Sequence, residues 1–389
     1  MSQRRIVLSN SYGTQNVGDE AILTVLVNEL SGRGFDVDIL TFTPRETQIR
    51  QEKATVIRSG VIRGSLSTIG AIRRASVLVV GGGGIIQDAT SFGNLLLHVS
   101  RPLMAALTGT PVVISGVGVG PLNRSLSRKL VRWACNRASS IDVRDSHSAA
   151  LLEAIGVPDE RVRQSADFAH LLEKCSVEEM DEVGRALINT LQLAREKGRL
   201  LVGLSLRPPI GDASRRSQMT AGDRSHLEHM ARVADGIVEK HDAQIIFVSM
   251  HAEQDDSIAS FLVKDMQHRD RVSLVSGKLQ PAVIKAAIAE LDLMIGMRLH
   301  SLIFAACHAV PFVALAYDDK VAAYCEALGL PVQALRPAQG QAESILSVVD
   351  RTLASSLQIR EQLRSAVPQL AAHANQSIDK ICEIALAKC

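Results

Sequence analysis

Aromatic side chains are scarce in this sequence of 389 residues, since Phe, Trp and Tyr together make up 3% of it. Proteins that recognise nucleic acids or sugars by stacking need aromatic platforms, so this scarcity argues against a stacking-based reader. A charge excess is also missing, because 43 Lys and Arg side chains are balanced by 41 Asp and Glu, which leaves a net charge of +2. Such a chain has no general attraction to nucleic acid, and we expect no nucleic-acid partner.

The cysteine spacing indicates neither a zinc site nor a disulfide framework. Six cysteines are present, but they form no CxxC pair and no regular spacing, so zinc motifs and a disulfide scaffold fall away. We expect no metal site. No uncharged apolar run reaches the ~18 residues of a membrane-spanning helix, and the first residues lack the apolar segment of a signal peptide. These features predict a cytoplasmic protein.

What the sequence does contain is an alternation of short apolar runs with helical stretches. Continuous apolar strands separated by helices are typical of a parallel sheet that is covered on both faces. In the first half, predicted strands lie at 5–9, 36–40, 54–57, 77–80, 111–115 and 141–143, and predicted helices include 19–30, 95–107 and 125–137. After a charged helical stretch at 172–197, a second block has predicted strands at 200–205, 244–248, 272–274, 291–295 and 312–315.

The alternation predicts an α/β protein with two Rossmann-like, doubly wound domains that face a cleft. We place an N-terminal domain at 1–185, a second domain at 186–365 and a C-terminal helix at 366–389. Ligands of such sheets bind beyond the carboxyl ends of the strands, and the cleft between two sheets is the default site. Residues 209–224 are polar and rich in Gly and Ser, which predicts a mobile loop.

The first polar motif follows the first predicted strand and contains Asn16, Asp19 and Glu20. The carboxylates suit the positive end of the helix that begins here, and they can cap it. They would repel a phosphate, so hydrogen bonding to sugar hydroxyls is the functional alternative. A plain helix cap and a sugar site fit these residues equally well.

Four consecutive glycines at 81–84 follow the predicted strand 77–80 and precede Gln87 and Asp88. Glycine lets a ligand approach the backbone closely and exposes amide donors. Close packing between strand and helix is the alternative. Four glycines in a row exceed what packing usually needs, so we favour a binding loop that includes Gly83 and Gly84. A similar glycine loop at 116–120 fits a purely structural role.

The most informative motif lies at 291–301, where a predicted strand ends at Gly296 and an apolar helix follows. Arg298 and His300 stand at the opening of that helix, where unpaired backbone amides and the helix dipole favour an anion. Arg298 adds a fixed positive charge, and His300 can donate a proton near neutral pH. A lone histidine in apolar surroundings is usually a core residue, but beside an arginine at this junction we favour a functional role.

Other strand ends of the second half carry further candidates. Arg207 ends a buried strand just before two prolines, where it can make a bidentate contact with a carboxylate or phosphate. Lys320 is a candidate anion contact and Tyr317 a candidate wall of the cleft. His251 follows another strand and is a candidate site residue, while Asp255 equally fits a helix cap.

A basic run in the first half makes one helix face cationic. It consists of Arg124, Arg128, Lys129 and Arg132. A solvated surface is the favoured interpretation of this face. Contact with an anionic membrane surface or with a lipid diphosphate is the alternative.

Taken jointly, these motifs resemble those of polysaccharide pyruvyl transferases of the bacterial cell-wall type. The matching segments are 12–23, 81–88, 116–121, 143–157, 205–208, 296–306 and 317–321. That family is similar in fold to GT-B glycosyltransferases, which have two Rossmann-like domains and an interdomain cleft. The chain departs from the usual family pattern at His251, Asp319 and Phe168, where the family often has Gln, Pro and Pro.

The resemblance implies transfer of a pyruvyl group from phosphoenolpyruvate to two hydroxyls of one sugar in a cell-wall or exopolysaccharide precursor, which gives a cyclic ketal. Arg298 and His300 would bind phosphoenolpyruvate and act in catalysis, and Arg207 and Lys320 would add contacts to this donor in the second domain. The first domain would form the acceptor side. The expected acceptor contacts are Asn16, Asp19, Glu20, Gly83, Gly84, Gln87, Asp88, His251 and Tyr317.

Phosphoenolpyruvate is expected as a co-substrate, with no further cofactor. The acceptor is a saccharide, free or lipid-linked, and a peripheral contact with the inner face of the membrane and a homo-oligomer both stay open. Two other functions fit the same motifs. One is a GT-B glycosyltransferase, whose nucleotide sugar would place its diphosphate at the same helix end. The other is a non-catalytic saccharide-binding protein.

Overall fold

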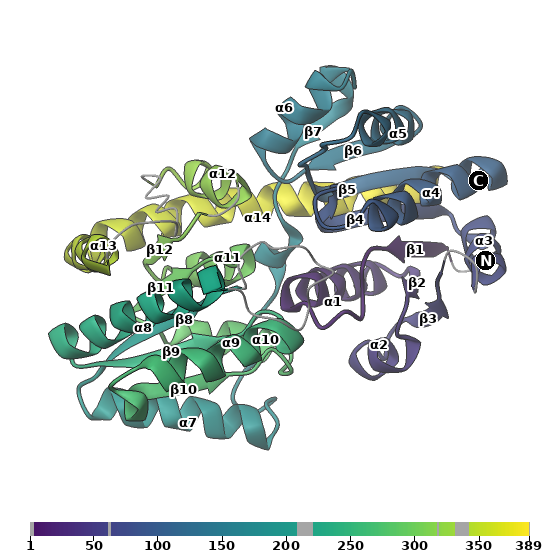
Figure 1. The fold of residues 1–389 in the computed structure, drawn as a ribbon. Helices are drawn as coiled ribbons and strands as arrows, with labels where there is room; N and C mark the ends of the chain where they lie inside the picture. Colours follow the sequence, from purple (N-terminus) through teal and green to yellow (C-terminus); the bar gives the residue numbers. More distant parts are fainter. Residues whose placement is uncertain (1–3, 61–63, 208–220, 317–318, 331–341, 389) are drawn as a thin grey trace. The chain divides into compact units, whose positions relative to one another are not determined.

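A computed structural model of the chain describes residues 4–60, 64–207, 221–316, 319–330 and 342–388. The chain divides into two compact units (Figure 1), of which unit 1 comprises residues 1–172 and 369–389 and unit 2 comprises residues 173–368. Each unit contains one parallel sheet with helices packed against it. Most of the predicted loop at 209–224 lies outside the described residues, and its last part belongs to the helix α8 (Ala221–His241).

The sheet of unit 1 has the strand order β3-β2-β1-β4-β5-β6-β7, and every neighbouring pair is parallel. Its strands are β1 Arg5–Ser9, β2 Asp36–Thr41, β3 Thr55–Arg58, β4 Val77–Ile86, β5 Val112–Val119, β6 Ser140–Val143 and β7 Val162–Gln164. Its helices are α1 Val17–Gly32, α2 Pro44–Arg50, α3 Ser65–Arg74, α4 Phe92–Thr108, α5 Ser125–Cys135 and α6 Ser146–Ala154, with 3-10 turns at Asp159–Arg161 and Phe168–Leu171. The order of connection reverses between β1 and β4, which makes this pair the switch point of the sheet.

The sheet of unit 2 has the order β10-β9-β8-β11-β12 and is also parallel throughout. Its strands are β8 Leu200–Ser205, β9 Ala243–Val248, β10 Val272–Val275, β11 Leu293–Gly296 and β12 Phe312–Ala314. Besides α8, its helices are α7 Glu182–Glu196, α9 Ala252–Asp265, α10 Pro281–Ala289, α11 Leu299–Cys307, α12 Asp319–Ala327 and α13 Ala342–Ala354, with a 3-10 turn at Arg269–Arg271. Here the switch point lies between β8 and β11.

The prediction of two doubly wound α/β sheets is confirmed, but the units divide at other residues than the predicted ones. The first division falls after Leu172 instead of at 185, because the segment that follows already bonds within unit 2, where Cys175 N donates to Ala282 O at 3.1 Å.

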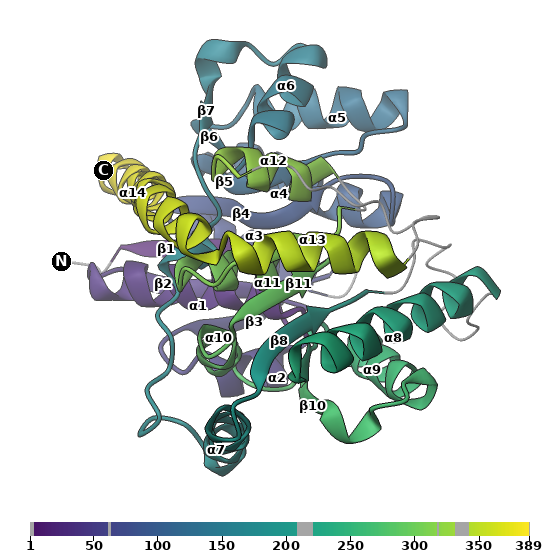
Figure 2. The ribbon, with the colours of Figure 1, turned by 90° about the vertical axis from the view of Figure 1, so that its left-hand side faces the viewer.

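The C-terminal helix also differs from its prediction. Helix α14 (Ser356–Ala387) runs unbroken past the predicted boundary at 366 (Figure 2). Its second half belongs to unit 1, where the hydroxyl oxygens of Ser377 and Ser165 lie 2.6 Å apart and Arg33 pairs with Asp379.

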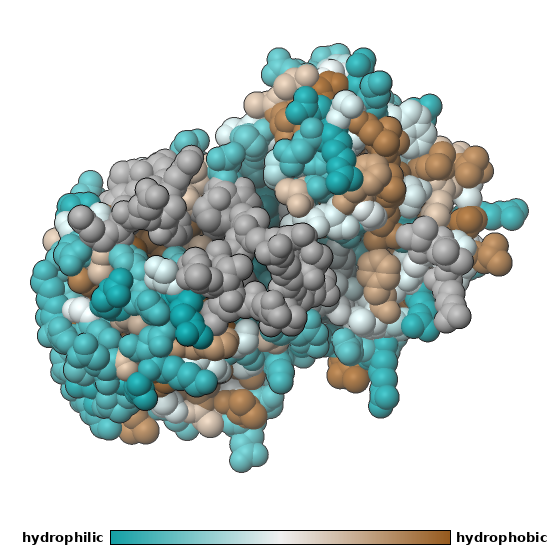
Figure 3. Space-filling model, viewed as in Figure 1, coloured by the Kyte–Doolittle hydropathy of each residue, from teal (hydrophilic) through white to brown (hydrophobic). Residues whose placement is uncertain are grey.

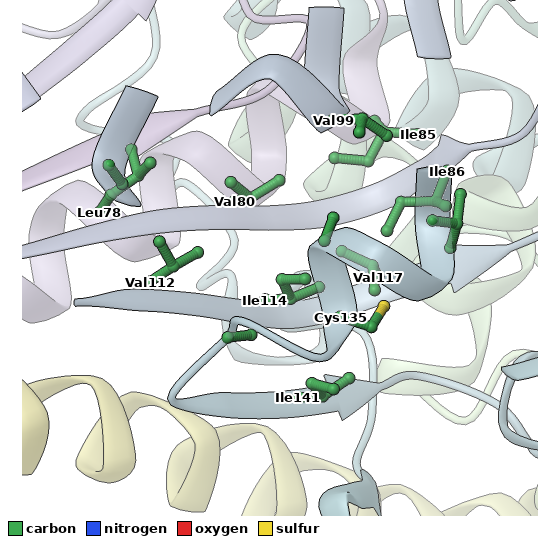
Figure 4. Packing of buried hydrophobic residues seen from close by; sticks show 14 of the residues in the cluster. Leu78, Val80, Ile85, Ile86, Val99, Val112, Ile114, Val117, Cys135 and Ile141 are labelled. Atoms are coloured by element: carbon green, nitrogen blue, oxygen red, sulfur yellow. The ribbon is translucent and has the colours of Figure 1, made fainter. Parts of the chain in front are cut away.

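The strands at the centre of unit 1 are buried on both faces, which explains why the alternation is visible in the sequence. Figure 4 shows side chains of β4 and β5 packed in the core of this unit. Val80 and Ile114 lie in the same cluster as Val99 of α4 and Cys135 of α5, and all four are at most 8% exposed. A strand covered on both sides has no polar face, so its sequence is a continuous apolar run.

The prediction of loop conformation is wrong at 81–84 and at 116–119, because both segments are strand. Strand β4 continues through the glycines to Ile86, and β5 continues through Gly116 to Val119. Gly82 and Gly83 adopt φ angles of +78° and +75°, and the pairing of β4 with β5 shifts register after Gly83. Glycine tolerates this positive φ without strain, so the strands keep pairing through an irregularity of the β-bulge kind.

Gly82→Ala tests whether packing requires this glycine. A Cβ at residue 82 would lie 2.2 Å from Cγ2 of Ile22 and would carry an unfavourable positive φ. We expect a loss of about 2–4 kcal/mol in the free energy of unfolding, measured with urea. Gly84→Ala is the matched control, since its Cβ would meet Arg144 Nη2 at an ordinary 3.5 Å. Equal stability of the two variants would contradict a packing requirement at Gly82.

The surface of unit 1 mixes hydrophobic and hydrophilic patches (Figure 3). Exposed apolar side chains of this unit include Leu103 and Leu107 on α4 and Leu126 on α5. The four basic side chains of the α5 run are also exposed. Arg124 lies over the ring of Phe92 at 4.8 Å. Among the helices that the structure describes, none combines the length and the apolarity that crossing a bilayer requires.

Candidate functional site

The strands around the switch point of unit 2 end at the cationic side chains that the sequence singled out. Ser205 of β8 and Gly296 of β11 are direct partners in the sheet, and Arg207 and Arg298 each stand two residues beyond this pair. His251 follows β9, on the other side of β8. The carboxyl edge of a doubly wound sheet, at its switch point, is where ligands of this fold bind.

Arg298 is the N-terminal capping residue of α11, and a buried carboxylate fixes its orientation. Its Nε donates to Asp255 Oδ2 at 3.1 Å and its Nη2 to Asp255 Oδ1 at 2.5 Å. Nη2 also donates to Gln254 Oε1 at 3.3 Å. No described residue accepts a hydrogen bond from Nη1, so this edge of the guanidinium can donate to an anion. The side chain of Arg298 is 16% exposed, whereas that of Asp255 is fully buried.

Asp255 is the residue of this site whose role the sequence did not reveal. It lies in the first turn of α9, and its Oδ2 also accepts from Met250 N at 3.0 Å. One backbone amide, Met250 N, therefore helps to hold the carboxylate that orients Arg298. An aspartate in a first helical turn fits a cap equally well, so only the fold shows its partner 43 residues away.

His251 lies beside the same arginine, although it was predicted as an acceptor contact. It precedes α9 as its capping residue, and Gln254 Nε2 lies 3.4 Å from its Nε2. Burial, followed by the Arg298 guanidinium, lowers the pKa of His251. Its Nδ1 is buried and finds no hydrogen-bond partner among the described residues. The imidazole is therefore neutral near pH 7 and can accept a proton.

The remaining donor-side candidates also stand at helix starts. His300 is the second residue of α11 and Lys320 the second residue of α12, and both are half-buried. Arg207 is half-buried as well. Helix N-termini and cationic side chains together favour an anionic ligand. Tyr317 lies outside the described residues.

The pairing of Arg298 with Asp255 predicts a measurable coupling. Asp255→Ala leaves a largely buried guanidinium without its counter-ion, and we expect a loss of about 2–4 kcal/mol in the free energy of unfolding by urea. The double variant Asp255→Ala, Arg298→Ala should lose less than the sum of the single losses. Glu383→Ala is the control, because this side chain is 69% exposed, its partner Lys380 is 38% exposed, and such surface pairs contribute under about 1 kcal/mol. Additive losses would show that the two charges do not stabilise each other.

In unit 1, two of the predicted acceptor contacts serve the start of α1. Asn16 caps the helix by accepting from Gly18 N at 3.1 Å. Glu20 Oε1 accepts from Gly13 N at 2.7 Å, and burial raises the pKa of this carboxyl. The cap bond thus comes from Asn16, whereas Glu20 bonds the backbone of the loop before the helix and does not cap it. These bonds do not test whether the same side chains also contact a sugar.

The structure brings Asp19 and the glycine run together across the β1–β4 switch point. Asp19 is 8% exposed, and a Cβ added to Gly83 would lie 2.6 Å from its Oδ1. Gly84 is exposed beside this pair. A carboxylate beside the exposed backbone of Gly84, within β4, is suited to sugar hydroxyls.

Gln87 and Asp88 lie just beyond β4 and have local partners. Asp88 is 6% exposed and accepts from Asn123 N at 2.7 Å and Arg124 N at 2.9 Å, which fixes the entry to α5. Gln87 is half-buried and its Oε1 accepts from Thr90 N at 3.0 Å. Both side chains thus fix the backbone that follows β4 and the backbone that leads into α5.

Arg144 is a neighbour of this edge to which the sequence analysis gave no role. It follows β6, its Nη1 donates to Asp167 Oδ2 at 2.8 Å, and its side chain is 5% exposed. A Cβ at Gly118 would lie 2.9 Å from its Nη2, so the guanidinium packs directly on the β5 backbone. The Val-Arg-Asp-Ser motif at 143–146 was the available signal, but the motif alone does not show where the arginine points.

Similarity to known proteins agrees with this arrangement. The family model "Polysaccharide pyruvyl transferase" matches residues 16–319. The amylovoran biosynthesis protein AmsJ of Erwinia amylovora is 26% identical over 283 residues, a match that covers 70% of this chain. The chain spans 65% of the length of AmsJ, slightly less than two thirds.

Solved structures resemble the chain in fold. The Staphylococcus aureus MnaA–UDP structure has a TM-score of 0.66 at 11% identity, covering 98% of this chain and 95% of that one. Anabaena Alr3699/HepE with UDP-glucose has a TM-score of 0.61 at 12% identity, covering 97% and 99%. At such identities the likeness concerns the fold alone. The family match, which spans most of the sequence, is decisive: this chain belongs to the polysaccharide pyruvyl transferase family.

Proposed function

We propose that this protein is a ketal pyruvyl transferase, which moves pyruvate from phosphoenolpyruvate onto two hydroxyls of one sugar in an exopolysaccharide or cell-wall precursor. Membership of the family supports the reaction class, and the similarity to AmsJ, an amylovoran biosynthesis protein, supports the polysaccharide context. The observation that carries the proposal is the position of Arg298 and His300 at the start of α11, beside the end of β8.

Phosphoenolpyruvate carries close to three negative charges, and unit 2 offers cations in matching number. Arg298 directs its Nη1 edge to the ligand while Asp255 holds its other edge. Arg207, from the adjacent strand end, and Lys320 complete the donor site. A guanidinium suits this task because it binds carboxylates and phosphates through paired N–H groups.

The reaction requires a proton at C3 and an oxygen nucleophile at C2. His300 donates a proton to C3 while a sugar hydroxyl attacks C2. The C2–O bond to phosphate then breaks through an oxocarbenium-like state, and the second hydroxyl closes the ketal. Each hydroxyl loses its proton, so one proton balances the gain at C3 and the other leaves with the phosphate or the solvent.

His251 is suited to accept a hydroxyl proton, since burial keeps its imidazole neutral and it lies beside Arg298. The acceptor sugar is assigned to the edge of unit 1 where Asp19 meets Gly83. We place the reaction in the cytoplasm, at the inner face of the membrane where the acceptor is lipid-linked. The donor and acceptor roles thus fall to different units.

Substitution of His300 tests the acid role. The full chain is incubated with phosphoenolpyruvate and candidate saccharides, free and lipid-linked, while phosphate release is followed and mass spectrometry detects the added pyruvyl group. We expect His300→Ala to lower kcat by about 10²–10⁴-fold, the usual contribution of general acid catalysis, and to leave the Kd for phosphoenolpyruvate within a few-fold of the original.

His268→Ala is the control, because this half-buried histidine of unit 2 pairs with Glu239 away from the carboxyl ends of the strands. Full turnover in His300→Ala would refute the acid assignment. Calorimetry separates the donor classes: heat on titration with UDP-glucose but none with phosphoenolpyruvate would replace the proposed reaction by glycosyl transfer.

A further inference from the structure

Unit 1 contains a buried cation that the proposed reaction does not use. Arg101 of α4 is 1% exposed and is the largest of the fully buried side chains. Its Nη2 donates to Ser59 Oγ at 2.5 Å and its Nη1 to Met104 Sδ at 3.5 Å. Its Nε finds no acceptor, and no carboxylate among the described residues lies within ion-pair distance of the guanidinium.

A guanidinium without an anion is unusual at this depth. Charged side chains are almost never fully buried unless they are paired, because removal from water is costly. Arg144 in the same unit shows the ordinary solution, with Asp167 at 2.8 Å and Asp145 at 3.5 Å. Burial lowers the pKa of Arg101 to about 10, so the side chain stays charged at neutral pH. The described part of the chain thus supplies the cation without a counter-ion.

The groups around Arg101 are donors that carry no negative charge. His98, three residues earlier on α4, is 2% exposed, and its Nε2 lies 3.3 Å from Ser11 Oγ. Burial, followed by the Arg101 guanidinium, lowers the pKa of His98 to about 4, which leaves the imidazole neutral. Its Nδ1 has no partner among the described residues. One cation, one neutral imidazole and two hydroxyls are a suitable set of donors for an oxyanion.

The position of these residues indicates which substrate, the acceptor or the donor, would carry the oxyanion. Ser11 follows β1 and Ser59 follows β3, so the cluster stands at the carboxyl edge of the unit 1 sheet. Ser11 is half-buried and forms the outer end of the cluster. Asp19 and Gly83, to which the acceptor is assigned, lie at the same edge. The donor phosphoenolpyruvate has its own cations in unit 2.

We propose that Arg101, His98, Ser11 and Ser59 form a buried oxyanion site that binds the acidic group, a carboxylate or a phosphate, of an acidic acceptor saccharide. The inference rests on the proposed function only for the identity of the ligand as the acceptor. A uronic acid would bring the carboxylate, and a sugar phosphate would bring the phosphate. The preferred substrates are then acidic saccharides and not neutral ones.

The test titrates the full chain, without phosphoenolpyruvate, with glucuronate, glucose 1-phosphate and neutral glucose. We expect at least one acidic sugar to bind, and Arg101→Met to weaken that binding tenfold or more. Arg73→Met is the matched control, since it removes the same charge from an exposed position of α3 and should bind as the original does. The stronger of the two acidic ligands identifies the carboxylate or the phosphate as the acidic group.

The stability of the variants distinguishes a ligand-binding role of Arg101 from a purely structural one. Without ligand, Arg101→Met should unfold at the same or higher urea concentration than the original chain, because an apolar side chain replaces an unpaired buried charge. Ser11→Ala provides a second variant that leaves the buried charge in place. It should weaken acidic-sugar binding several-fold, with only a small loss of stability because His98 Nε2 loses its hydroxyl partner.

The proposal would be overturned if neither acidic sugar binds, or if the original chain and both site variants bind equally. Binding of inorganic phosphate alone would mark an adventitious ion only and would also overturn it. A loss of phosphoenolpyruvate affinity in Arg101→Met would reassign the site to the donor and overturn it as well. These titrations measure binding and need no turnover. A protein that binds acidic sugars but transfers no pyruvyl group would therefore contradict the proposed function and not this inference.

Discussion

The ion pair of Asp255 with Arg298 is the interaction on which the proposed donor site depends. Asp255 is fully buried and binds the Nε–Nη2 edge of the guanidinium, which leaves the Nη1 edge for a ligand. Without this carboxylate, the arginine at the start of α11 would lose both its counter-ion and its orientation. The neighbouring positions follow from sheet register, because Ser205 pairs with Gly296 and an arginine stands two residues beyond each.

Three buried or largely buried arginines differ in the number of carboxylates that compensate their charge. Arg144 has aspartates on two sides and is a closed structural pair. Arg298 has one carboxylate and one open edge. Arg101 has hydroxyl and thioether partners but no counter-ion among the described residues. We propose that this difference in compensation distinguishes an arginine that stabilises the fold from arginines that bind an anionic ligand.

Much of the fold could be predicted from the sequence, because strands buried on both faces are continuous apolar runs between helical segments. The strand-to-helix junction at Gly296 could be predicted too, since a glycine, an arginine and a histidine precede an apolar helix. The conformation of the glycine runs could not be predicted, because composition does not show that Gly82 and Gly83 keep pairing within β4 while their φ is positive.

Long-range partners could not be predicted at all. Nothing near Asp255 in the sequence points to Arg298, and nothing near Arg101 indicates that it lacks a carboxylate, because both facts arise when distant segments pack. The path of α14 has the same cause. Its second half pairs with Ser165 and Arg33 of unit 1, and a helical pattern alone does not say which sheet it will cover.

A crystal structure of the full chain with phosphoenolpyruvate would test the central claim most directly. The account predicts the ligand at the carboxyl edge of the unit 2 sheet, with an oxyanion on Arg298 Nη1 and C3 of the enol facing His300. Phosphoenolpyruvate bound at the carboxyl edge of unit 1, or bound in unit 2 away from Arg298, would contradict it.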